Sequence, residues 1–159
     1  MFAGRRVVSA TAAVILVVGF FLPWMAGTDV FEFRTFSGFD FARLIRNFEI
    51  TADTTSESGQ VRAAAAGLYM VPALAINGAV VHLGSAFRPD LRRWAAVTMV
   101  AGAFYAAAVL ALTLFLSLVD VNEFATVVGA PRLGFFVSVI GSVVLATVGV
   151  REMRSPAVR

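Results

Sequence analysis

The chain contains no cysteine and no lysine, and only one of its 159 residues is a histidine. The absence of cysteine excludes disulfides, thiolate metal sites, iron–sulfur clusters and thiol redox chemistry. Charged residues make up 14% of the chain, whereas soluble domains carry about 25%. These shortages exclude cysteine chemistry and favour a chain that lies in a bilayer.

The basic residues are all arginine, and the sequence pI is about 10.5. A high pI is also found in proteins that bind nucleic acid. Here the arginines flank apolar segments and do not form a basic patch, so we expect no nucleic-acid partner. The expected partner is the lipid bilayer.

Four apolar segments are close to the length of about 20 residues that a helix needs to cross a membrane. The chain is 59% hydrophobic, with a mean hydropathy of +0.84. The first segment is expected to be a retained helix rather than a signal peptide, because its exit, LPWMAG, has no small-x-small cleavage site. We therefore predict one integral membrane domain, residues 1–159, that is all-α and forms a four-transmembrane-helix bundle. The expected spans are approximately 7–24, 62–86, 94–118 and 133–150.

The distribution of arginine predicts the orientation of these spans. The N-terminus, the 87–93 connector and the C-terminal tail carry eight of the arginines and only two acids, Asp90 and Glu152. Arginine-rich segments remain in the cytoplasm by the positive-inside rule. We expect a multi-pass cell-membrane protein with both termini cytoplasmic and with loops 25–61 and 119–132 outside the cytoplasm.

The outer loop 25–61 carries local signals for a small cap. Pro23 ends the first span, and Trp24 stands where an interfacial aromatic is expected. Residues 28–36 alternate in polarity, which is typical of a strand. Ser37 and Asp40 have the spacing of a capping box, and an amphipathic pattern follows over residues 41–48. The cap is therefore expected to combine a short β-strand or hairpin with an amphipathic helix.

The outer loop is also rich in phenylalanine. Aromatic side chains on such a loop anchor either to a bilayer or to a partner protein. Packing onto the bundle is the alternative explanation, and the sequence leaves both open. The candidate interaction surface consists of Trp24, Phe31, Phe33, Phe36, Phe39, Phe41, Leu44, Ile45 and Phe48.

Small residues recur every four positions in the last two spans. Such stripes let helix backbones approach closely, either within one chain or against a partner subunit. Asn77 lies deep in the second span and is expected to bond to a neighbouring helix, with Ser138, Ser142 or Tyr105 as partner. Pro72 is expected to kink the same span. The predicted packing residues are Asn77, Gly102, Ala106, Gly134, Ser138, Gly141 and Ser142.

His82 is the one candidate cofactor ligand. It follows Gly78 by four residues, and a small-xxx-His pattern in a membrane helix is found in helices that bind a pigment or haem. The alternative is a histidine hydrogen-bonded at the membrane interface, with Asp90 as a carboxylate that could approach it. We expect the structural role and therefore no cofactor.

No catalytic motif is present. The chain has no G-x-S-x-G element and no glycine-rich phosphate loop, and no charged residue lies in the middle of a span, as ion-coupled transport usually requires. We therefore expect no catalytic residue, no metal site and no enzyme activity. A small transporter or a membrane enzyme remains the alternative.

Two segments carry a resemblance to known proteins. FFLPWMAGTDVFEF…SGFD and the ending GAPRLGFFVSVIGSVVLATVGV resemble small, functionally uncharacterised bacterial four-helix membrane proteins. The layout is also similar to that of claudin-like proteins, without their cysteine motif, which implies four spans and a first outer loop that forms a small sheet. We therefore expect a non-catalytic interaction or structural role. The protein would act as an accessory subunit of a membrane complex, or would self-associate through the outer loop as a homo-oligomer.

Overall fold

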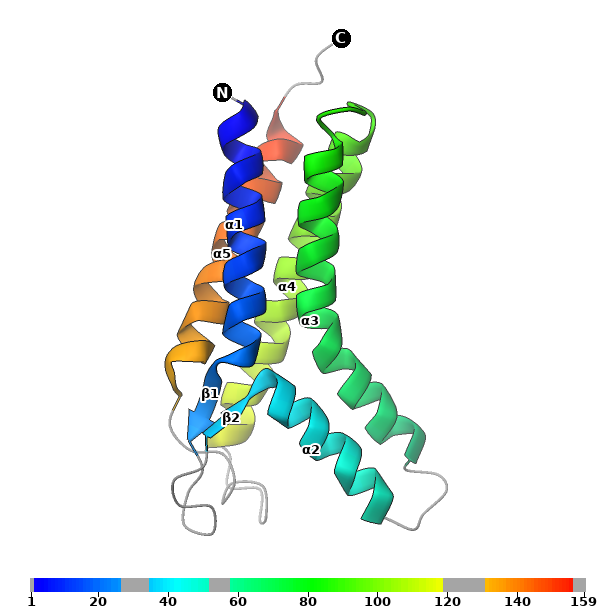
Figure 1. Cartoon of the computed structure of the whole chain (residues 1–159), viewed down its shortest axis with the longest axis vertical. Helices are drawn as coiled ribbons and strands as arrows, with labels where there is room; N and C mark the ends of the chain where they lie inside the picture. Colours follow the sequence, from blue (N-terminus) through cyan, green and yellow to red (C-terminus); the bar gives the residue numbers. More distant parts are fainter. Residues whose placement is uncertain (1, 27–34, 52–57, 119–130, 156–159) are drawn as a thin grey trace.

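The computed structural model describes residues 2–26, 35–51, 58–118 and 131–155, in which it contains five helices and one two-stranded sheet. Four of the helices form an elongated bundle (Figure 1), so the expected all-α bundle with a small cap is confirmed. The start of α1 and the end of α5 lie at one end of the bundle, which we call the terminal end. The sheet and α2 lie at the opposite end, the cap end. In chain order the elements are α1 (Phe2–Phe21), β1 (Pro23–Ala26), β2 (Thr35–Ser37), α2 (Gly38–Thr51), α3 (Ser58–Gly84), α4 (Leu91–Leu118) and α5 (Leu133–Arg154).

The four bundle helices are long and apolar enough to cross a membrane, over Gly4–Phe21, Ala66–Gly84, Leu91–Phe115 and Leu133–Arg154. Their outward faces carry large apolar side chains, and Phe104 is 77% exposed. A bundle whose outward faces carry many large apolar side chains is stable in lipid and unfavourable in water. The chain is therefore a multi-pass membrane protein.

Several helix ends differ from the expected spans, since α1, α3 and α4 all begin three to five residues earlier, and two further differences bear on the cap and on the terminal end. α1 ends at Phe21 rather than continuing to residue 24, because Pro23 cannot extend the helix and begins a strand instead. α5 continues through Arg154, beyond the expected end at residue 150. Glu152 therefore lies on a helix and not in a tail.

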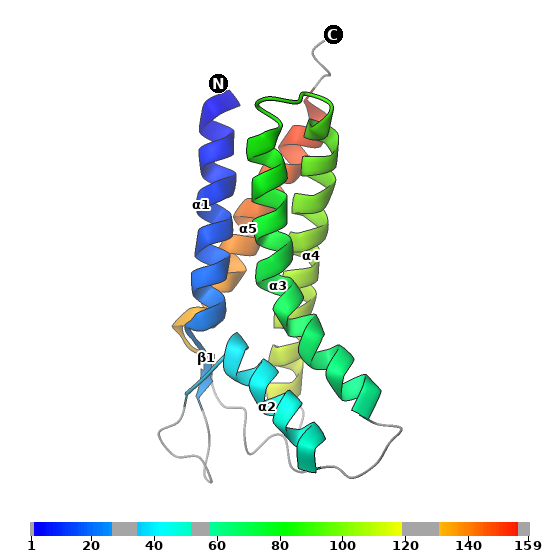
Figure 2. The same ribbon diagram turned by 45° about the vertical axis from the view of Figure 1, so that its right-hand side comes forward.

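The bundle closes as a ring in which α5 lies beside α1 and α4, and α3 completes the ring between those two helices. Figures 1 and 2 show this arrangement from two sides. Glycine sets the closest approach: a Cβ added to Gly19 of α1 would lie 2.5 Å from Ser138 Oγ, and one added to Gly134 would lie 2.5 Å from the Leu22 carbonyl oxygen. These positions accept no side chain without movement of the backbone.

α3 contains Pro72, and its first half turns away from the bundle (Figure 1). Proline removes one backbone donor and clashes with the preceding turn, so it bends a helix. The expected kink is present. The first half of α3 is thereby directed toward α2, which lies against it.

β1 and β2 form an antiparallel pair in which Met25 faces Phe36 and Ala26 faces Thr35. The register is irregular between Pro23 and Met25, so Trp24 forms a bulge. Of the expected strand at residues 28–36, only Thr35 and Phe36 fall within the described residues. β2 is shorter than the expected strand, and it pairs with β1, the segment directly after α1.

α2 begins where the sequence predicts. The Asp40 backbone N–H donates to Ser37 Oγ at 3.1 Å, and the Ser37 backbone N–H donates to Asp40 Oδ2 at 3.0 Å. This reciprocal pair is a capping box, which satisfies donors that the first helical turn leaves free. Gly38 has no side chain to separate the helix start from the rings of Phe20 and Trp24. The cap is thus joined to the end of α1.

Candidate functional site

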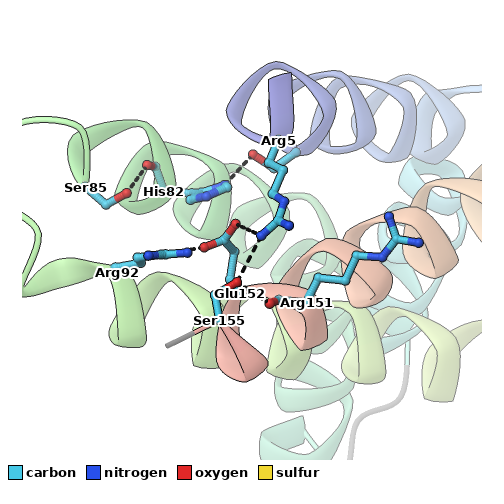
Figure 3. Close-up of polar contacts among 8 residues, drawn as sticks. Arg5, His82, Ser85, Arg92, Arg151, Glu152 and Ser155 are labelled. Carbon is cyan, nitrogen blue, oxygen red and sulfur yellow. Dashed lines mark hydrogen bonds and ion pairs between the residues drawn. The ribbon is translucent and has the colours of Figure 1, made fainter. Parts of the chain in front are cut away.

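The most polar buried region lies at the terminal end and centres on Glu152 of α5 (Figure 3). Its side chain is 2% exposed. Glu152 Oε1 accepts a hydrogen bond from Arg5 Nη1 at 3.2 Å, and Glu152 Oε2 accepts one from Arg92 Nε at 2.6 Å. Removing a carboxylate from water costs several kcal/mol unless partners compensate. The two arginines provide this compensation and join α1, α4 and α5.

His82 adds the fourth helix to this region. It lies in the last turn of α3, is 2% exposed, and has Nδ1 2.7 Å from Ser9 Oγ of α1. Ser9 Oγ also lies 2.9 Å from the Arg6 carbonyl, to which it donates. When the single proton of the Ser9 hydroxyl is donated to the Arg6 carbonyl oxygen, Ser9 Oγ accepts a hydrogen bond from the protonated Nδ1 of His82. We call Arg5, Ser9, His82, Arg92 and Glu152 the terminal cluster.

Serine hydroxyls complete the hydrogen bonding around the terminal cluster. Ser85 Oγ donates to the His82 carbonyl oxygen at 2.6 Å. Ser155 Oγ accepts from Arg5 Nη1 at 3.0 Å and donates to the Arg151 carbonyl oxygen at 2.9 Å. The Arg151 side chain itself points away from Glu152 (Figure 3). These bonds fix the ends of α3 and α5.

A cavity of about 590 Å³ adjoins the terminal cluster and is lined by residues of α1, the α3–α4 connector, the start of α4 and the end of α5. We call it the terminal cavity. Asp90 lies on its wall and is exposed, so the carboxylate expected near His82 does not join the cluster. The charged and hydroxyl residues that line the cavity are Arg6, Ser85, Asp90, Arg92, Arg93, Glu152 and Ser155.

The predicted aromatic interaction surface is divided by the structure. Trp24 is buried rather than exposed at an interface: its Nε1 donates to the Gly19 carbonyl oxygen at 2.8 Å, and its ring meets Phe20 edge to face. Phe41 is buried, and Phe36 and Phe39 are half-buried against the core.

The other members of that surface are not brought into one site. Leu44 is half-buried on α2. Ile45 and Phe48 belong to α2, but their side chains lie outside the described residues, as do Phe31 and Phe33 altogether. The described part of the surface therefore serves mainly to attach the cap to the bundle.

The predicted packing residues lie at helix contacts, with one exception. Gly141 faces the Leu16 backbone and Gly102 faces the Leu74 backbone. Ala106, Gly134, Ser138 and Ser142 are buried, and Ser142 Oγ donates to the Ser138 carbonyl oxygen.

The prediction for Asn77 was wrong, because Asn77 is exposed on the outer face of α3. Its neighbour Gly78 faces Met99 of α4, and adjacent residues on a helix point in different directions. Tyr105, one of its expected partners, donates to the Gly67 carbonyl oxygen instead. Asn77 therefore contributes no contact to the packing of α3 on α4.

The polar groups of the terminal cluster are engaged by one another and by neighbouring serines. Ser9 and His82 are the residue types of a nucleophile and a base, but Ser9 is fully buried and the Glu152 oxygens are engaged by arginine. Among the described residues no group of three His, Cys, Asp or Glu side chains could hold a metal ion.

The sequence interpretation missed the role of Glu152. In the sequence Glu152 is one charge of a basic tail, yet in the structure it continues the stripe of buried residues on α5 that includes Leu145, Val148 and Gly149. The steps of three and four residues along this stripe are those of one helix face. Continuing this face beyond Ser142 in alternating steps of three and four residues would have placed the carboxylate inside.

No protein-family model, curated protein or solved structure matches the chain. A functional conclusion therefore depends on the residues and their geometry. The two regions that bear on it are the terminal cluster with its cavity and the cap at the other end of the bundle.

Proposed function

We propose that this chain is a non-catalytic membrane protein that works through interaction, either as an accessory subunit of a membrane complex or by associating with further copies of itself. The observation that carries the proposal is the terminal cluster. Its carboxylate, arginines and histidine are engaged in hydrogen bonds that join different helices, and both oxygens of Glu152 accept from arginine. Such bonds hold the helices together at the terminal end, so contacts with another protein would be made at the cap end.

The orientation follows from charge. The terminal end carries the excess of arginine, and positively charged segments remain cytoplasmic. The cap then lies outside the cytoplasm. This places the partner of the cap in the outer leaflet, in the extracytoplasmic space or in a neighbouring membrane protein.

The cap is the favoured contact region because its aromatic side chains are only partly used by the fold. Phe36 and Phe39 remain half-buried, while Phe31 and Phe33 stay candidates from the sequence. Partly exposed aromatic rings are frequent anchors of protein interfaces. Self-association through the cap is the version that can be tested without knowing another partner.

The test uses two copies of the full chain with different affinity tags, expressed together and purified in a mild detergent. We expect the second copy to be recovered with the first, and the double variant Phe31→Ser, Phe33→Ser to reduce recovery about tenfold, the equivalent of 1.4 kcal/mol. Phe87→Ser is the matched control, since Phe87 is 90% exposed at the terminal end. Equal recovery for the cap variant and the wild type would contradict association through the cap.

The orientation has its own test, which uses the absence of cysteine from the chain. Thr35→Cys places a thiol at the exposed first residue of β2, and Phe87→Cys places one on the α3–α4 connector. A membrane-impermeant maleimide should label the first in intact cells and the second only after permeabilisation. The reverse pattern would invert the proposed orientation.

A further inference from the structure

The terminal cavity has a surplus of positive charge that the fold does not use. Three arginines, Arg6, Arg92 and Arg93, line it together with the carboxylates Asp90 and Glu152. Both oxygens of Glu152 are already engaged by Arg5 and Arg92. Arg6 and Arg93 make no ion pair with any residue that the structure describes. The cavity therefore presents two guanidinium groups from different helices that pair with no described carboxylate, against the single carboxylate of Asp90 that is not engaged by arginine.

The chemistry of these groups indicates the kind of ligand. A guanidinium group is planar, remains charged at all physiological pH values, and presents paired N–H donors that match the oxygens of a phosphate. The serine hydroxyls on the wall are already bonded within the chain, Ser85 to His82 and Ser155 to Arg5 and Arg151. Binding at this site would therefore depend on Arg6 and Arg93.

The size and position of the cavity indicate the source of that phosphate. Its volume of about 590 Å³ lies within the range of about 300–1,000 Å³ that small-molecule sites occupy, so it holds a phosphate together with the group that carries it. Ala86, Pro89 and Met153 supply an apolar part of the wall. Phe87 and Trp94, which are 90% and 67% exposed, directly follow the lining residues Ala86 and Arg93 in the chain, and tryptophan exposed near a helix end is typical of the membrane–water interface.

We propose that the terminal cavity binds a phosphate-bearing anion, held by Arg6 and Arg93, and that the headgroup of an anionic phospholipid is its source. Basic pockets between membrane helices at the cytoplasmic surface are suited to such headgroups. The Asp90 carboxylate on the same wall repels a bound anion and therefore lowers the affinity of the site. This inference goes beyond the interaction role of the cap, and neither proposal requires the other.

The test titrates short-chain phosphatidylglycerol into the purified full chain in a neutral detergent and measures heat of binding. The double variant Arg6→Gln, Arg93→Gln should weaken binding about fivefold for each arginine removed. The matched control is Arg151→Gln, Arg154→Gln, which removes the same charge from the same end of the bundle at exposed residues that do not line the cavity. The control should bind as the wild type does, and equal weakening in both double variants would overturn the proposal.

A second variant separates an anion site from a cation site and does not depend on the arginine variants folding. Asp90→Asn removes the repulsive carboxylate while keeping a side chain that suits the residue before a helix, and it should tighten phosphatidylglycerol binding several-fold. Weaker binding by Asp90→Asn, or no binding by the wild type, would overturn the proposal.

The source of the phosphate is decided by repeating the titration with inorganic phosphate and with phosphatidylcholine. Neither should compete with phosphatidylglycerol at matched concentration. Competition by inorganic phosphate that is lost in Arg6→Gln, Arg93→Gln would support the phosphate site and reject the lipid as its source.

Discussion

The two ends of the bundle are closed by different physical means. At the terminal end, ion pairs and hydrogen bonds join all four helices around Glu152 and His82. At the cap end, aromatic rings and a short sheet close the space around Trp24. In a bilayer, apolar surface gains little from burial, so directional bonds and close packing specify how helices associate. The bonds at the terminal end therefore determine which helices pack against one another, and the cap covers the opposite end of the bundle.

The largest effect is expected from Trp24→Ala at the cap end. The indole is fully buried and bonded to the Gly19 carbonyl oxygen, and the Trp24 carbonyl accepts from the Arg132 N–H. Losing so large a buried ring should cost about 4 kcal/mol. Thermal unfolding in detergent measures the loss, and hydrogen exchange should increase in β1, β2 and the start of α5 while the start of α1 stays protected. Uniform exchange throughout the bundle would contradict separate closure of the two ends.

The next effect is expected from Glu152→Gln at the terminal end. The change leaves Arg5 and Arg92 without their charge partner, although Arg5 is 35% exposed and keeps part of its hydration. Breaking a buried pair costs about 3 kcal/mol, the lower end of the usual range. The unfolding free energy in detergent gives the loss, and Asp90→Asn, which removes an exposed carboxylate, should leave it unchanged. An unaltered free energy for Glu152→Gln would show that the cluster does not hold the helices.

A smaller effect is expected from Gly19→Ala on the seam between the two ends. The added methyl group would meet Ser138 Oγ at 2.5 Å and the Ser138 backbone nitrogen at 2.9 Å, and overpacking of this kind costs about 2 kcal/mol. Gly4→Ala on the same helix is the control, since nothing lies within 4 Å of its added Cβ. The unfolding midpoint should fall for the first variant only. A similar midpoint for both would contradict the close approach of α1 and α5.

The smallest effect is expected from Ser37→Ala at the start of α2. The variant loses the hydroxyl that accepts from the Asp40 N–H and donates to Asp40 Oδ2, which should cost about 1 kcal/mol. Hydrogen exchange should increase in α2 alone, because the bond is local to the cap. Increased exchange in α4 or α5 would contradict a local role.

The features that could be predicted from sequence are those that depend on neighbouring residues. The lengths of the apolar segments predict the bundle, Pro72 predicts the bend in α3, and Ser37 with Asp40 predicts the start of α2. Each of these features is determined by residues close together in the sequence, so it can be predicted without knowledge of the rest of the fold.

The features that could not be predicted depend on contacts between distant segments. Trp24 is a residue type that is frequent at the membrane–water interface, and its burial requires β2 and the residues before α5 to fold over it. Asn77 was expected inside because amides at depth usually seek partners, yet the approach of Gly78 to Met99 turns it outward. The terminal cluster is predictable only in part. The stripe on α5 places Glu152 on the inner face, but it gives no information about its partners Arg5 and Arg92.

The central claim is that the chain self-associates through the cap and not through the terminal end. It is tested most directly by cross-linking in native membranes with a short bifunctional maleimide, using the variants Thr35→Cys and Phe87→Cys of a chain that otherwise has no thiol. A partner cysteine is supplied by a second copy with the same substitution. The account predicts a covalent dimer from Thr35→Cys and only monomer from Phe87→Cys. Monomer from both variants, or dimer from Phe87→Cys alone, would contradict it.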